Sequence, residues 1–115
     1  MTNQHINLDY LDLMTDGDDE MRQTMLEMII DEIPSEMEKM RESWQTGDLS
    51  AIKEISHKMK STLAFVGNDR LTEANRAVEN IARGNESPAG FAEQFAIIEQ
   101  ELPLVLGELG LVAAV

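Results

Sequence analysis

The chain has 115 residues, a formal net charge of −13 at pH 7 and no cysteine. This length predicts one domain over residues 1–115, with a modest core, and the lack of cysteine excludes disulfides and thiolate metal sites. The negative charge argues against nucleic acid and anionic membrane surfaces as partners, because their phosphates would be repelled.

Helical periodicity runs along the whole chain, and no window alternates as a β-strand does. A short amphipathic segment over residues 6–14 comes first, followed by a long helix over residues 18–44. Pro34 predicts a kink or a restart in that helix, and Gly47 ends it. The side expected to be buried holds Met21, Met25, Met28, Ile29, Ile33, Met37, Met40 and Trp44.

Three further helices follow. The first covers residues 48–66, with Asp48 as its cap and Gly67 as a structural C-terminal residue. The next covers residues 69–83, and the last begins at Pro88 after a Ser87 cap, with Pro103 expected to bend it. Their expected core residues are Leu49, Ile52, Ile55, Met59, Leu63 and Val66, then Leu71, Ala74, Val78, Ile81 and Ala82, then Phe91, Phe95, Ile98, Leu102, Leu106 and Leu109.

Connections of only a few residues make successive helices antiparallel neighbours. The sequence therefore predicts an all-α fold, an antiparallel up-down four-helix bundle with a short additional N-terminal helix across one end. Few aromatic residues and no cavity-forming glycines are present, so we expect no internal ligand pocket. No signal-peptide pattern and no apolar run of about 18 residues is present, which predicts a soluble, cytoplasmic protein.

His57 lies on the polar side of the helix at residues 48–66. At 100° per residue it falls about 140° from the centre of the apolar stripe. The neighbours on its row are Lys53, Lys60, Ser61 and Ala64. This places an exposed imidazole between two cations and two small side chains, which leave room for another protein to approach. Periodicity alone also allows an exposed histidine without a function.

A neutral imidazole can attack phosphorus near neutral pH, and Lys60 could offset the charge of the phosphohistidine that results. The segment from Lys53 to Arg83 contains six basic and four acidic residues, so its net charge is positive in an otherwise acidic chain. An anion is therefore better tolerated here than elsewhere. No carboxylate is expected beside His57, which leaves hydrolytic acid–base catalysis unsupported. His5 has no evident partner, and two such distant histidines are weak evidence for a metal site.

The run SHKMKSTLAFVG, residues 56–67, resembles the histidine-containing phosphotransfer (HPt) family. The family pattern is histidine, a hydrophobic residue, lysine and glycine or serine, with a later glycine; here these are His57, Met59, Lys60, Ser61 and Gly67. DRLTEANRAVE is similar to the next helix of the family, and residues 18–43, with the GD that follows, are similar to the preceding helix and turn. The whole run is most similar to single-domain members of bacterial quorum-sensing phosphorelays. Ser61 stands where most members have glycine.

This resemblance implies a phosphohistidine carrier in a His–Asp phosphorelay. His57 would be the phosphoacceptor, Lys60 would stabilise the phosphoryl charge, and Lys53, Ser61 and Ala64 would dock the partner. The partners implied are receiver domains of response regulators, including that of a hybrid sensor kinase. No cofactor is expected, because Mg²⁺ would belong to the receiver, and no nucleotide-binding glycine loop is present. We expect a monomer. We also expect a phosphotransfer intermediate rather than an enzyme, without an ATP site of its own.

Two other functions remain compatible with the sequence. One is a receiver-binding adaptor with the same bundle that carries no phosphate, although it would need neither His57 nor Lys60. The other is a structural helical module that dimerises through the apolar C-terminal segment LGLVAAV. Truncation after Glu108 would test the second of these.

Overall fold

The computed structural model describes residues 5–114, and every regular element within them is a helix. The four long helices and the short N-terminal one are therefore confirmed, with boundaries close to those predicted. The elements are α1 (Asp9–Thr15), α2 (Asp19–Thr46), α3 (Leu49–Val66), α4 (Asp69–Ala82), the 3₁₀ turn η1 (Pro88–Gly90) and α5 (Phe91–Ala113).

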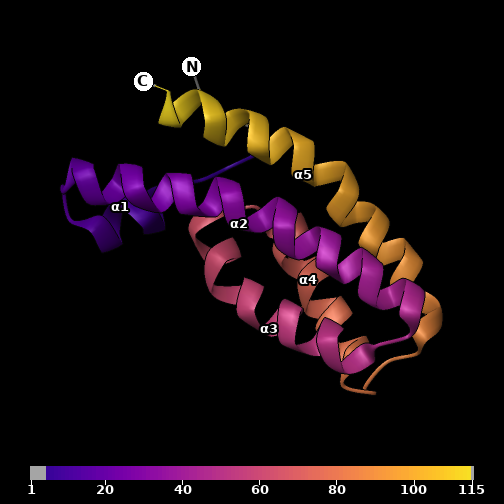
Figure 1. Cartoon of the computed structure of the whole chain (residues 1–115). Coiled ribbons are helices and arrows are strands. Elements are labelled where there is room, and N and C mark those ends of the chain that lie inside the picture. Colours follow the sequence, from indigo (N-terminus) through magenta and orange to yellow (C-terminus); the bar gives the residue numbers. More distant parts are fainter. Residues whose placement is uncertain (1–4, 115) are drawn as a thin grey trace.

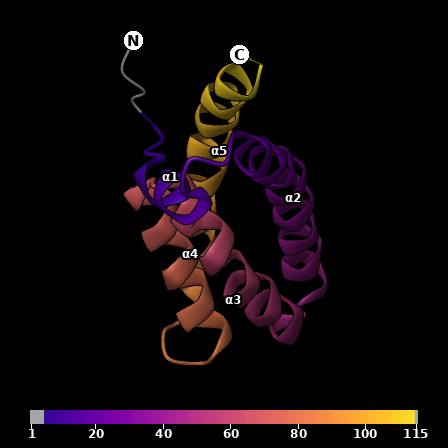
Figure 2. The same ribbon diagram turned by 90° about the vertical axis from the view of Figure 1, so that its left-hand side faces the viewer.

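The long helices form a closed bundle (Figure 1). Helix α3 packs against both α2 and α4, α4 packs against α5, and α5 returns to α2. Figure 2 shows α1 outside this ring, where it contacts α2 and α3. The predicted four-helix bundle with an additional N-terminal helix is the observed architecture.

Only Gly67 and Asn68 connect α3 to α4. Gly67 ends α3 with φ of 70°, and the side chain of Asn68 caps α4 by accepting a hydrogen bond from Leu71 N at 2.9 Å. A Cβ at Gly67 would come within 2.3 Å of the carbonyl oxygen of Asn7, so the N-terminal segment also requires glycine here. This two-residue turn places α4 directly alongside α3.

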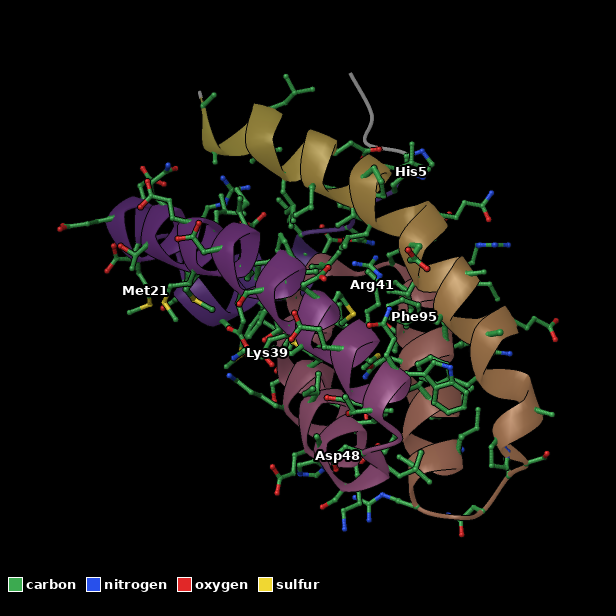
Figure 3. The ribbon with its side chains drawn as sticks, turned by 45° about the vertical axis from the view of Figure 1, so that its right-hand side comes forward. His5, Met21, Lys39, Arg41, Asp48 and Phe95 are labelled. Atoms are coloured by element: carbon green, nitrogen blue, oxygen red, sulfur yellow. The ribbon has the colours of Figure 1, made fainter. Side chains whose placement is uncertain are left out.

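The prediction for α2 is wrong in part. Met21 and Met28 are 48% and 58% exposed, whereas Leu26, which was not predicted to be buried, is fully covered. Figure 3 shows Met21 projecting away from the bundle. The reason is that this helix has more apolar positions than one face can bury. The observed core stripe is Leu26, Ile29, Ile33, Met37 and Met40.

The prolines leave their helices unbroken. Helix α2 runs continuously through Pro34, so the predicted restart does not occur. Helix α5 likewise continues through Pro103, and in Figure 1 it curves along its length, as a helix with an internal proline does. Ser87 caps the start as predicted, accepting from Ala89 N at 3.2 Å, but the first turn is the 3₁₀ turn η1 rather than α-helix.

The apolar C-terminal segment is the last part of α5 and belongs to the bundle. Leu109 is fully buried, Val112 and Ala113 pack against the core, and the carbonyl of Ala113 accepts a hydrogen bond from Gln23 at 2.9 Å. Truncation after Glu108 would therefore remove core residues rather than a free tail. Among the residues that the structure describes, no helix is long and apolar enough to cross a membrane.

Candidate functional site

The row predicted on α3 lies on the surface of the bundle. The side chain of His57 is 65% exposed and that of Lys60 is 50% exposed. Lys53, Ser61 and Ala64 are exposed as well. The opposite side of α3 supplies the core with Ile52, Ile55, Met59, Leu63 and Val66. The amphipathic pattern of α3 thus directs the imidazole towards solvent, while the apolar side of the helix packs into the core.

A glutamate on α4 contacts this row, which corrects the expectation that no carboxylate lies beside His57. The side chain of Glu79 is only 4% exposed, and its Oε2 lies 3.2 Å from Nδ1 of His57. Its Oε1 lies 2.7 Å from Nζ of Lys60, and Arg83 Nη2 donates to Oε2 at 2.9 Å. The site therefore has one buried anion beneath three exposed donors.

The environment of Glu79 keeps it ionised. Burial by itself raises its pKa, but hydrogen bonds from Lys60, Arg83 and His57 outweigh burial and lower the pKa to about 2. An ionised carboxylate only accepts hydrogen bonds, so Nδ1 of His57 must be the donor in this contact. In the neutral ring, the lone pair is then on Nε2.

The other lysine near His57 belongs to a different site. Lys58 Nζ lies 3.0 Å from Oε1 of Glu36, a buried residue of α2, and Lys39 lies 3.3 Å from the same oxygen. The contact with Glu36 raises the pKa of Lys58. Lys58 and Lys60 therefore each pair with a buried glutamate, but on opposite sides of α3.

His5 does have a partner, contrary to expectation. Its backbone N–H donates to both carboxylate oxygens of Glu108 at 3.0 and 3.1 Å, and its Nε2 lies 3.8 Å from Oε2. Figure 3 shows His5 beside α5. The structure therefore gives the two histidines separate surroundings. Within residues 5–114 no group of three or more histidine and carboxylate side chains could hold a metal ion.

Comparisons with known proteins agree with this fold. A family model of the Hpt domain matches residues 24–109. The fold is similar to the crystal structure of histidine-containing phosphotransfer protein B (HptB) from Pseudomonas aeruginosa PAO1, with a TM-score of 0.85 and 16% identity. That alignment covers 98% of this chain and 97% of HptB. No curated protein matches the sequence.

Proposed function

The chain belongs to the Hpt domain family, and from this premise we propose that His57 is its phosphoacceptor in a His–Asp phosphorelay. Hpt domains are phosphocarriers rather than kinases, and they interact with receiver domains of response regulators. In this proposal His57 accepts the phosphoryl group from a receiver aspartate, such as that of a hybrid sensor kinase, and passes it to another receiver. The observation that carries the proposal is the contact between His57 Nδ1 and the buried Glu79.

The tautomer explains how His57 would react. With the hydrogen on Nδ1, the lone pair of Nε2 attacks the phosphorus of the aspartyl phosphate in line. The Nε2–P bond forms as the bond from phosphorus to the aspartate oxygen breaks, and the carboxylate leaves with the electron pair. Positive charge develops on the imidazole ring, and Glu79 stabilises it at 3.2 Å.

Lys60 would act on the other side of the transferred group. It is the exposed cation nearest in sequence to His57 on this face, and its ammonium is held 2.7 Å from Glu79. A cation held by its ion pair can stabilise the phosphoryl oxygens with little reorganisation. The Mg²⁺ that assists transfer would be bound by the receiver, and this chain would supply only position and charge.

The proposed docking surface is the row of Lys53, His57, Lys60, Ser61 and Ala64, with α1 along one edge. On α1, Tyr10 stacks on Phe65 of α3, with ring centroids 5.1 Å apart. The exposed fractions of Tyr10, Leu13 and Met14 are 45%, 71% and 53%. Exposed apolar side chains next to small ones suit a protein partner. Carriage of phosphate is favoured over a pure adaptor role, since docking alone would not need the His57–Glu79 contact.

Incubation with a phosphorylated receiver domain tests the proposal directly. The chain should acquire phosphate that is labile in acid and stable in base, as a phosphohistidine is, and mass spectrometry should place it on His57. Return of the label to a second receiver would establish the carrier role. A chain that binds the receiver without taking up phosphate would be an adaptor.

We expect Lys60→Ala to slow transfer and shorten the lifetime of the phosphohistidine more than Lys58→Ala does. Removing a preorganised charge slows a reaction by roughly tenfold to a thousandfold, and we expect the transfer rate to fall by about tenfold at this solvent-exposed surface. The two variants are matched, since each removes a lysine from a buried glutamate. Transfer assays quenched at successive times measure the rate, and the loss of label from the isolated phosphorylated chain measures the lifetime of the phosphohistidine. Equal effects would contradict the assignment of Lys60.

We expect Ser61→Gln to weaken receiver binding and slow transfer, with the fold unchanged. Glutamine adds bulk next to His57 without charge and keeps good helix propensity. Ser61→Gly should bind at least as well as the parent, although glycine inside a helix lowers its stability by roughly 0.5–1 kcal/mol. Isothermal titration against one unphosphorylated receiver compares the variants. Parental affinity for Ser61→Gln would place the docking surface elsewhere.

A further inference from the structure

A buried amide joins α4 to the backbone of α3 just before His57. Asn75 is 1% exposed, and its Nδ2 donates to the carbonyl oxygen of Ser56 at 2.9 Å. Ser56 is itself fully buried, with its hydroxyl hydrogen-bonded to the carbonyl of Ile52 at 2.8 Å. The side chain of Asn75 thus holds the peptide that leads into His57.

Core packing alone does not account for this asparagine. Its Oδ1 is buried and accepts no hydrogen bond from the residues that the structure describes. Such an acceptor usually weakens a fold. The Ser56 carbonyl lies inside α3 and already serves the helix ladder, so it does not depend on Asn75. An apolar side chain at this position would serve the core at least as well.

The position of Asn75 relative to Glu79 indicates a different role. The two residues are one helical turn apart on α4, and their partners, Ser56 and His57, are consecutive on α3. Asn75 therefore fixes the backbone at the point where Glu79 holds the imidazole. The Nδ1–Oε2 distance of 3.2 Å leaves only a few tenths of an ångström before the hydrogen bond is lost.

We propose that Asn75 is a positioning residue that sets the register of α4 against α3, so that Glu79 keeps the hydrogen of His57 on Nδ1. This inference rests on the proposed role of His57 as phosphoacceptor. The hydrogen bond from Asn75 is directional, so it resists sliding and rotation of α4 against α3. Without it, Glu79 holds the ring less firmly, and the tautomer with the hydrogen on Nε2, which has no lone pair there, gains population.

Asn75→Leu separates this role from a structural one. Asn75 lines a hollow of about 290 Å³ between α3 and α4, together with Leu63 and Thr72, which leaves room for the leucine methyls. We expect a melting temperature no lower than that of the parent, and phosphotransfer slower by about tenfold. The ¹⁵N shifts of the His57 ring should move towards a mixture of the two tautomers. Asn80→Leu is the matched control, because Asn80 is also on α4 but is only partly buried, and its side chain makes no hydrogen bond to α3 in the part of the chain that the structure describes.

The outcomes distinguish this inference from the proposed function. Parental ring shifts and a parental transfer rate in Asn75→Leu would overturn the role of Asn75 while leaving His57 as the acceptor. A lower melting temperature with unchanged ring shifts would show that Asn75 is merely structural. If His57→Gln, assayed alongside, still takes up phosphate, the proposed function itself fails. Asn75→Ala, which removes the same donor with less bulk, should reproduce the ring shifts of Asn75→Leu.

Discussion

His57→Gln is expected to abolish phosphate acceptance while helicity and melting temperature stay close to those of the parent. Glutamine has no ring nitrogen to attack phosphorus, and the position is 65% exposed. Substitutions at such positions usually change stability by within about 0.5 kcal/mol. Glutamine can also donate to Glu79, so the buried carboxylate keeps a partner. Labelling from a phosphorylated receiver, circular dichroism and thermal melting measure the three quantities.

The second histidine provides the control for this result. His5→Gln should take up phosphate as the parent does, because its backbone N–H rather than its ring makes the closer contacts with Glu108. Residual labelling of His57→Gln would show that the acceptor is another residue. An unfolded His57→Gln would show that the ring contributes to the fold, which its exposure does not suggest.

The face of His57 could be predicted from the sequence because it depends on one helix alone. At 100° per residue, the apolar residues of α3 fix which side is buried, and the remaining side is the surface. Helix ends were predictable for a similar reason. Asp48 and Gly67 act through backbone groups a few residues away, so their roles are local.

Glu79 could not be predicted in this way. A helical wheel shows which side a residue faces, but not which residue of the neighbouring helix it meets. That meeting depends on the register between α3 and α4, which the contacts between the two helices set, the hydrogen bond from Asn75 to the Ser56 carbonyl among them. The available signal was a glutamate next to the apolar Val78, four residues before Arg83. A carboxylate that close to the core usually has partners.

The methionines of α2 show the limit of apolar periodicity. Met21 and Met28 repeat at seven residues, as core positions do, yet both are exposed. Helix α2 extends past the end of α3, so its N-terminal half has α1 and the end of α5 as neighbours (Figure 1). The buried side there depends on where those elements lie, and the sequence of α2 does not contain that information.

Glu79→Gln is expected to slow phosphotransfer by roughly tenfold to a thousandfold. The amide has the shape of the carboxylate but lacks its charge. It also offers a donor as well as an acceptor to Nδ1, so it no longer requires the hydrogen to be on that nitrogen. Lys60 and Arg83 lose their shared anion at the same time. Transfer rates and the ¹⁵N shifts of the His57 ring measure the effect, and uptake at the parental rate would contradict the role given to Glu79.

The same substitution should change how stability depends on pH. The pKa of Glu79 is about 2 in the folded chain against an ordinary value of 4.5. Because the folded value is the lower one, the stabilisation is complete above pH 4.5 and is lost as pH falls towards 2. This part of the free energy of unfolding is on the order of 3 kcal/mol.

The parent should therefore exceed Glu79→Gln in stability at pH 7, and the difference should shrink at about pH 3, as urea unfolding would show. Glu36, also a buried glutamate with a lowered pKa, is present in both proteins and cancels in the comparison. A difference that stays constant between the two pH values would mean that Glu79 is not held ionised beneath His57.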